Sequence, residues 1–322
     1  MAAVTLVLGV DGGNSKTDAA VVTSDGELLA WVRGPGSATS PDRAAATVAE
    51  LLERTGLDVG AAVGGCYLAG VDLPFQADAV RTALADRGVV AEVANDAWAL
   101  LRAGAPPSAP SVAVVCGAGL KCVARAGEAR VEFPGLGWQT GDLSGAGDHL
   151  AREAIRAAAR AEDGRGPATA LRDVVRSLLG VPSIGVLAER MLRRELTGRD
   201  LDGLAPAVLD AWRAGDDVAG ALVRGLAEEI AASARAARRA AADAVGSAAA
   251  WTLVLGGGLF ADPAGRLLSA LPQRLWDEFE PSVVTGPPVA GAVLLGLDRL
   301  GVAGRDAAIL RTFHDATPEV VR

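Results

Sequence analysis

Two glycine-rich turns contain residues whose types suit phosphate binding. The first is Asp11-Gly12-Gly13-Asn14-Ser15-Lys16-Thr17, which lies between two apolar runs. Glycines there can adopt positive φ and have no Cβ, so backbone N–H groups can surround a phosphate while Ser15 and Thr17 offer hydroxyls. Asp11 could hold a hydrated Mg²⁺ beside that phosphate. The same residues also favour an ordinary β-hairpin turn, and the segment lacks the spacing of a Walker A loop.

The second turn is Gly117-Ala118-Gly119, which follows the first strand of the second half of the chain as Gly12-Gly13 follows that of the first half. Two such turns facing each other would clamp one polyphosphate. A third segment, Gly256-Gly257-Gly258, lies between a predicted strand and a predicted helix and permits close approach of a ring or a phosphate. Simple strand-to-helix geometry explains this third segment equally well.

Two aspartates are candidates for chemistry on a hydroxyl. Asp96 follows Asn95 at the end of a predicted strand, where either residue is a good helix N-cap. Alternatively, Asp96 acts as a general base on a hydroxyl that attacks a terminal phosphate. Asp142 lies on a glycine-flanked loop, where it could accept hydrogen bonds from a vicinal diol or satisfy its own backbone.

The elements that must position these residues form two similar halves. In each half, three predicted antiparallel strands form a meander, and alternating helices and strands then make the sheet parallel. A Gly/Pro-rich segment at residues 104–111 marks the boundary between the halves, and a ligand cleft is expected between them. The predicted strands cover residues 5–10, 18–23, 28–33, 66–69 and 89–93, then 112–116, 120–124, 129–133, 251–255 and 282–284. The predicted helices cover residues 41–54, 76–87, 217–245, 264–278 and 289–300.

The composition excludes several classes of protein. The chain has 322 residues, 50% of them hydrophobic, which suffices for two domains with separate cores. A formal net charge of −8 argues against a nucleic-acid binder. Cys66, Cys116 and Cys122 lack metal-site spacing, so we expect neither a zinc site nor disulfides. The sequence has no signal-peptide pattern and no apolar run of about twenty residues, which predicts a cytoplasmic protein without a membrane partner.

Seven short motifs follow one another along the chain. The motifs are Gly9-Val10-Asp11-Gly12-Gly13-Asn14-Ser15-Lys16-Thr17, Gly34-Pro35-Gly36-Ser37, Leu68-Ala69-Gly70-Val71-Asp72, Asn95-Asp96-Ala97, Cys116-Gly117-Ala118-Gly119-Leu120-Lys121-Cys122, Gly137-Trp138-Gln139-Thr140-Gly141-Asp142 and Leu255-Gly256-Gly257-Gly258-Leu259-Phe260. On these motifs and their order the chain resembles the N-acetylglucosamine kinase group of the BadF/BadG/BcrA/BcrD ATPase family, within the actin, hexokinase and Hsp70 superfamily.

The resemblance implies an α/β fold of two ribonuclease H-like, actin-like ATPase domains flanking an interdomain cleft. The first domain would comprise residues 1–108 with a returning helix at 289–300, the second residues 109–288 with helical insertions, and residues 301–322 a tail that packs on the surface or frays. Both domains would close around Mg-ATP and an amino sugar, and a homodimer is a further expectation. No nucleic-acid partner is implied.

The resemblance also implies roles for individual residues. The loop Asp11 to Thr17 would bind the β- and γ-phosphates, Gly117 to Gly119 would form the second phosphate loop, and Gly256 to Gly258 would approach the adenosine. Asp96 falls on the position of the family's catalytic base, which would deprotonate a sugar hydroxyl, by analogy O6. The residues expected to contact the sugar are Ser37, Asp72, Asn95, Asp96, Lys121, Trp138 and Asp142.

Three departures from the family pattern concern the substrate. Lys121 replaces a sugar-binding asparagine, Ser37 stands where asparagine is common, and Leu143-Ser144 stands where Glu-Gly often follows. Lys121 could bind an anionic substituent, pair with Asp96 and lower its pKa, or point to solvent. These departures leave the identity of the hexosamine open.

Two other functions are compatible with the same fold. One is an ATPase activator that carries an iron–sulfur cluster at a subunit interface, which would need suitably placed cysteines. The other is a catalytically altered relative that senses a sugar or a nucleotide, a hypothesis that rests on Leu120 and Lys121. The leading hypothesis remains an ATP-dependent kinase of N-acetylglucosamine, glucosamine or a derivative.

Overall fold

A computed structural model describes residues 5–135, 146–244 and 250–321 of the chain. Its first sheet has the strand order β11-β3-β2-β1-β4-β5, in which β1, β2 and β3 are antiparallel and β4 and β5 run parallel to β1. The strands are β1 (Leu6–Gly12), β2 (Lys16–Thr23), β3 (Leu28–Pro35), β4 (Val63–Leu68), β5 (Glu92–Ala94) and β11 (Glu319–Val320). The predicted meander and its change to parallel pairing are confirmed.

The second sheet repeats this topology. Its order is β10-β9-β6-β7-β8, so β6, β7 and β8 form an antiparallel meander while β9 and β10 are parallel to β6. The strands are β6 (Ser111–Cys116), β7 (Leu120–Ala126), β8 (Ala129–Phe133), β9 (Thr252–Gly256) and β10 (Glu280–Val283). Both sheets therefore have the ribonuclease H-like strand order, and the predicted fold class is confirmed.

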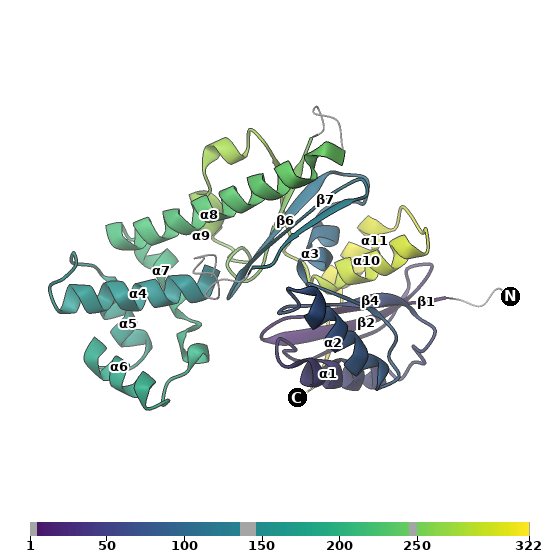
Figure 1. Cartoon of the computed structure of the whole chain (residues 1–322), viewed down its shortest axis with the longest axis horizontal. Helices are drawn as coiled ribbons and strands as arrows, with labels where there is room; N and C mark the ends of the chain where they lie inside the picture. The colour runs from purple at the N-terminus through teal and green to yellow at the C-terminus, as the bar shows by residue number, and fades with distance from the viewer. Residues whose placement is uncertain (1–4, 136–145, 245–249, 322) are drawn as a thin grey trace.

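Helices cover both faces of the first sheet because successive strand residues alternate between the faces. Leu8 and Val10 of β1 pack with α1 (Pro41–Arg54) and α2 (Pro74–Ala85). Val7, on the other face, packs with α10 (Val289–Arg299) and α11 (Asp306–Asp315). Figure 1 shows these two helical layers below and above the strands.

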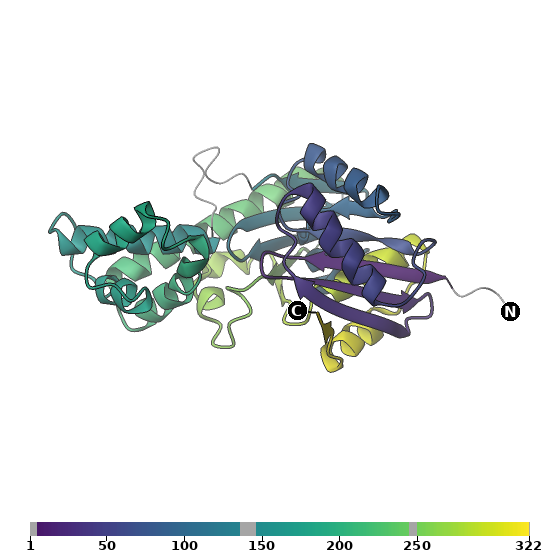
Figure 2. The same ribbon diagram turned by 90° about the horizontal axis from the view of Figure 1, so that it is seen from below.

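The second sheet has a larger helical complement. The long helix α8 (Asp217–Ala241) packs along the sheet through alanine and leucine side chains, in one core with α4 (Ala146–Glu162) and α7 (Leu204–Arg213). Helices α5 (Leu171–Leu178) and α6 (Ile184–Leu192) complete a helical group that lies at the end of the molecule opposite the N-terminus in Figures 1 and 2.

Helix α3 (Ala97–Gly104) joins the two sheets and forms the centre of the molecule. Its buried residues share a core with Tyr67 of β4, with Ala113 and Val254 of the second sheet, and with Ala292 of α10. A Cβ at Gly291 would overlap the carbonyl oxygen of Ala99, so α3 and α10 cross at very short distance. Both sheets are thereby fixed to one connecting helix.

Two predictions about the C-terminal part can be compared with the structure, and one of them needs correction. The helix expected at residues 264–278 is wrong, because α9 spans only Arg266–Ala270 and Pro272 separates it from the short helix Gln273–Leu275. Of the two alternatives for residues 301–322, the structure has packing rather than fraying: Ile309 and Phe313 of α11 are buried, and β11 pairs with β3. Among the described helices, none is long and apolar enough to span a bilayer.

Candidate active site

The first glycine-rich turn is the tip of the β1–β2 hairpin. Strand pairing continues to Gly12 and Thr17, and the N–H of Gly13 donates to the carbonyl of Lys16 at 2.8 Å. Asn14 and Ser15 are exposed at the tip. The hairpin interpretation and the phosphate-loop interpretation are therefore compatible, because the hairpin presents the exposed residues at the end of the buried strand β1.

Ser37 lies behind this turn rather than at its surface. It is 2% exposed, its N–H donates to the carbonyl of Gly13 at 3.1 Å, and its hydroxyl would overlap a Cβ at Gly12. Its Oγ has no hydrogen-bond partner within the described parts of the chain. In this conformation Ser37, expected to contact the substrate, supports the turn from behind.

The second glycine-rich turn, Gly117 to Gly119, has open space where side chains would project from its two glycines. No atom of the described residues lies within 4 Å of a Cβ built at Gly117 or Gly119. The carbonyls of Gly117 and Ala118 accept hydrogen bonds from Gly147 and Asp148 at the start of α4, at 2.9 and 3.0 Å. The backbone of this turn is thus fixed by α4, while its outer face is not covered by any part of the chain that the structure describes and could receive a ligand.

The structural constraint differs among the three glycines after β9. A Cβ at Gly256 would overlap Leu100 of α3, and Gly257 has φ +92° and lies against the backbone of Cys116. Only Gly258 has open space at its Cβ position. Packing explains the first two glycines, and Gly258 remains the candidate for close approach of a ligand.

Asp11 is a buried carboxyl at the end of β1. It is 9% exposed, and burial together with repulsion from Asp96 and Asp18 raises its pKa to about 8, against the attraction of Lys16 and Arg33. Buried Asp18 beside it accepts hydrogen bonds from Arg33 Nε at 2.7 Å and from Trp31 Nε1 at 3.1 Å. This group of Asp18, Arg33 and Trp31 was not predicted from the sequence, although the polar residues within the apolar run of β2 and the cross-strand position of Arg33 indicate it.

Asp96 lies at the β5–α3 junction but does not cap the helix with its side chain. The turn is held instead by Asn95, whose Oδ1 accepts from the N–H of Ala97 at 3.0 Å and whose Nδ2 donates to the carbonyl of Val71 at 3.2 Å. Burial raises the pKa of Asp96 to about 7 and repulsion from Asp72 adds to this, whereas Lys121 and the N–H of Ala97 act in the opposite direction. The capping alternative thus applies to Asn95, and the carboxyl of Asp96 is left for another role.

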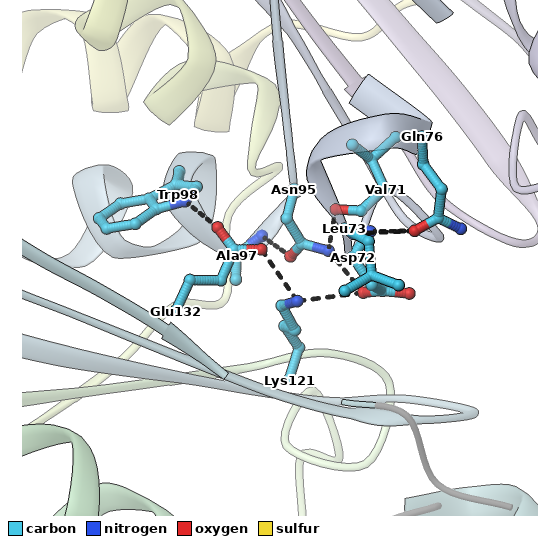
Figure 3. Close-up of polar contacts among 9 residues, drawn as sticks. All are labelled: Val71, Asp72, Leu73, Gln76, Asn95, Ala97, Trp98, Lys121 and Glu132. Carbon is cyan, nitrogen blue, oxygen red and sulfur yellow. Dashed lines mark hydrogen bonds and ion pairs between the residues drawn. The ribbon is translucent and has the colours of Figure 1, made fainter. Parts of the chain in front are cut away.

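Lys121 connects this junction to the second sheet, as Figure 3 shows. Its Nζ lies 3.1 Å from Asp72 Oδ1 and 2.9 Å from Glu132 Oε1, and its side chain is 8% exposed. Asn95 Nδ2 donates to the same Asp72 oxygen at 3.1 Å, and Trp98 Nε1 donates to Glu132 Oε2 at 2.8 Å. The solvent-pointing alternative for Lys121 is wrong. Glu132 was missed, because no local pattern links a β8 residue to Lys121 on β7.

Two of the expected sugar contacts, Trp138 and Asp142, lie outside the described residues, as do Leu143 and Ser144. The described candidates form two groups. Asp11, Asp72, Asn95 and Asp96 come from the ends of β1, β4 and β5, and Lys121 joins them from the second sheet. The glycines of the second group, Gly117, Gly119 and Gly258, come from the ends of β6 and β9.

These residues fit a nucleotide with a divalent cation. The open positions at the three glycines suit close approach of phosphate and ring atoms, and Thr17 Oγ1, beneath the first turn, is buried without a partner among the described residues. Burial first, and then repulsion from Asp96 and Asp18, raises the pKa of Asp11, and a bound cation would favour the ionised form of this carboxyl. No three His, Cys, Asp or Glu side chains are grouped as metal ligands in the described ranges, so a magnesium ion would rely on Asp11, water and phosphate oxygens.

Comparison with known proteins agrees with this geometry. Residues 8–296 match the BadF/BadG/BcrA/BcrD ATPase family. An N-acetylmuramic acid/N-acetylglucosamine kinase of Clostridium acetobutylicum is 28% identical over 235 residues, which cover 70% of this chain and 76% of the relative. Among solved structures, a candidate N-acetylglucosamine kinase of Chromobacterium violaceum has a TM-score of 0.68 at 25% identity, covering 91% of this chain and 99% of that one. A second, from Porphyromonas gingivalis, has a TM-score of 0.64 at 19% identity, with the same two coverages, and shows the fold alone.

Proposed function

The chain belongs to the BadF/BadG/BcrA/BcrD ATPase family, and from the geometry of its site we propose that it is an ATP-dependent kinase of a hexosamine. The observation that carries this proposal is the carboxyl of Asp96. It lies at a strand end beside Asp11 and Asp72, it makes no side-chain helix cap, and its pKa of about 7 suits a general base near neutral pH. The similarity to kinases of amino sugars supports the same conclusion.

In the proposed reaction Asp96 accepts the proton of an acceptor hydroxyl, which we assign as O6, while that oxygen attacks the γ-phosphorus of ATP. The P–O bond to ADP breaks as the new P–O bond forms. Asn95 holds the turn that carries Asp96, and Asp72 is available to accept a hydrogen bond from another sugar hydroxyl. Trp138 and Asp142 remain proposed sugar contacts.

We assign the phosphates to the two glycine-rich turns. N–H groups and side chains of Asn14, Ser15 and Lys16 would bind the terminal phosphates, with Gly13 shaping the tip of the hairpin, together with the second turn at Gly117, Ala118 and Gly119. Gly258 would approach the adenosine, with Gly256 and Gly257 shaping the turn before it. A magnesium ion held through water by Asp11 would neutralise charge on the phosphates. Fixed backbone donors of this kind stabilise charge without reorganising during the reaction.

The cysteines do not favour the iron–sulfur alternative. Cys66, Cys116 and Cys122 are all buried, and burial raises the pKa of each thiol, Cys66 and Cys122 to about 12. Cluster ligands must be thiolates that reach a shared ion, and Cys66 lies in a different sheet from the other two. The sensor alternative predicts ligand binding without turnover, which the activity test below separates.

The test is a coupled ADP-release assay with Mg-ATP and a panel of sugars: N-acetylglucosamine, glucosamine, N-acetylmuramic acid and glucose. We expect turnover that depends on an amino sugar, with the phosphorylated position determined by NMR of the product. Folded, nucleotide-binding protein that shows no sugar-stimulated ADP release with any of the four would contradict the kinase proposal.

A further inference from the structure

Four polar side chains join the two domains beside the proposed acceptor site. Asp72 follows β4 and Trp98 lies on α3, whereas Lys121 and Glu132 come from β7 and β8 of the second sheet. We propose that Lys121 is a positioning residue that locks the domains together through Asp72 and Glu132, and that it is not the receptor for an anionic group of the substrate. This inference rests on the proposed kinase function.

The Lys121 ammonium already has carboxylate partners from both domains. It has three N–H donors, and carboxylates of both domains lie within 3.1 Å of it. Asp96, when ionised, adds a third negative charge to the neighbourhood of this one ammonium. An incoming carboxylate or phosphate would have to displace one of these carboxylates from the buried ammonium and would meet the remaining ones. The acceptor therefore carries no negative charge at this position.

Polar contacts connect Lys121, through Asp72 and Asn95, to the turn that carries Asp96. The Asp72 oxygen that faces Lys121 also accepts from Asn95 Nδ2, and Asn95 Oδ1 accepts from the N–H of Ala97. If the Asp72 carboxylate moves, the Asn95 side chain that is bonded to it must move as well, and Asn95 holds the turn that carries Asp96. Loss of the ammonium would leave Asp72 without its charge partner and loosen this turn.

Lys121 is also close in the sequence to the second glycine-rich turn. It lies two residues after Gly119 of the second glycine-rich turn, on a strand that pairs with β6 up to Cys116. The same residue therefore fixes the distance between the phosphate-binding turn of one domain and the Asp72–Asn95 junction of the other. Glu132 strengthens this link, because its second oxygen accepts from Trp98 on the connecting helix.

The experiment compares Lys121→Met, Lys121→Arg and Glu132→Gln in the full chain, with circular dichroism and thermal melting to confirm folding. Exposed Arg274→Met is the matched control for losing a cation in an ion pair. With neutral or amino sugars we expect Lys121→Met to lower kcat about tenfold or more while the acceptor KM changes less than about threefold. Lys121→Arg should recover most of kcat because an arginine can bridge two carboxylates, and Glu132→Gln should give an intermediate loss.

Two kinetic results would overturn the proposal. One is a Lys121→Met protein that keeps the wild-type kcat on neutral sugars. The other is a loss confined to N-acetylmuramic acid, which would make Lys121 an anion receptor. Small-angle X-ray scattering without ligands gives an answer independent of activity: a larger radius of gyration for Lys121→Met than for Lys121→Arg supports the interdomain lock, and equal radii contradict it. If no variant, including wild type, turns over sugar, the kinase proposal fails while the scattering result still decides the lock.

Discussion

Asp18 and Lys121 occupy equivalent positions in the two halves of the molecule. Asp18 on β2 pairs in register with Asp11 of β1, and Lys121 on β7 pairs with Val115 of β6, each one pair before the end of its hairpin. Both side chains are buried and carry opposite charges. Asp18 finds its partners Lys16 and Arg33 within its own sheet, whereas Lys121 finds one partner in its sheet and one in the other domain.

The two halves share one strand topology but place different chemical groups at equivalent strand ends. In the first half the strand ends carry carboxylates, among them Asp11 and Asp96. In the second half the connection equivalent to the one that holds Asp96 is residues 284–288, which contain no ionisable side chain, and the hairpin turn offers open glycine backbone instead. In the proposed reaction each half supplies one phosphate-binding turn, the first half alone supplies the base, and the site is complete only when both halves are held together.

The largest expected effect comes from removing the carboxylate that only the first half possesses. Asp96→Asn keeps the shape of the side chain but removes the base, so we expect kcat to fall about 10²–10⁴-fold. Nucleotide binding, measured by calorimetry with a non-hydrolysable ATP analogue, should stay within about threefold of wild type because Asp96 is not part of either glycine-rich turn. A variant with near-normal turnover would transfer the role of base to another residue.

The next prediction compares the two turns directly. Gly119→Ala fills the open space at the second turn, so we expect the KM for ATP to rise about tenfold with little change in the melting temperature. Gly12→Ala forces a Cβ into Ser37 and Leu68, so we expect it to destabilise the fold by about 1–3 kcal/mol. Thermal melting and ATP titration of both variants check this contrast. Equal destabilisation by both substitutions would mean that the second turn is also closed by packing.

How far the sequence predicts this architecture depends on the range of the interactions. Strand and helix positions follow from local apolar patterns, and the repeated meander followed from them as well. Asp11 and Gly12 were assigned to a turn, whereas β1 and β2 remain paired up to Gly12 and Thr17, because the ladder overrides the local preference of Asp and Gly. The helix predicted at 264–278 failed at Pro272, where chain geometry outweighs the apolar pattern.

The site was predicted less completely than the fold, for a physical reason. Asp96 and the glycine-rich turns stand at strand ends, which a sequence pattern can indicate. The pairing of Lys121 with Asp72 and Glu132 depends on how two domains approach each other, and nothing near Lys121 in the sequence encodes it. The packing role of Gly256 and Gly257 likewise required the position of Leu100 and Cys116.

A smaller effect is expected on the stability of the first half. Folding raises the pKa of Asp11 from 3.8 to about 8, so the folded chain binds more protons than the unfolded chain between these values. The contribution of Asp11 to stability is therefore full below pH 4 and is lost as the pH rises towards 8. We expect Asp11→Asn to raise the melting temperature at pH 8 by about 3–10 °C and to have no effect near pH 4. Exposed Asp315→Asn is the control, and a pH-independent difference would contradict the assignment.

The smallest effect concerns the pH dependence of turnover and tests whether the two halves are electrostatically coupled. A base with a pKa of about 7 predicts that kcat/KM falls about tenfold per unit below that pH. Among the described residues, Asp11, Asp72 and Lys121 are the charged side chains that act on Asp96, and of these three only Lys121 favours its ionised form. Lys121→Met should therefore move the acid limb to higher pH by less than about one unit, while Lys121→Arg leaves it unchanged. Glu132 faces Lys121 rather than Asp96, so Glu132→Gln should keep the acid limb of the kcat/KM profile near its wild-type position. An upward shift of that limb in Glu132→Gln would mean that the charge of the ammonium does not act on Asp96 directly.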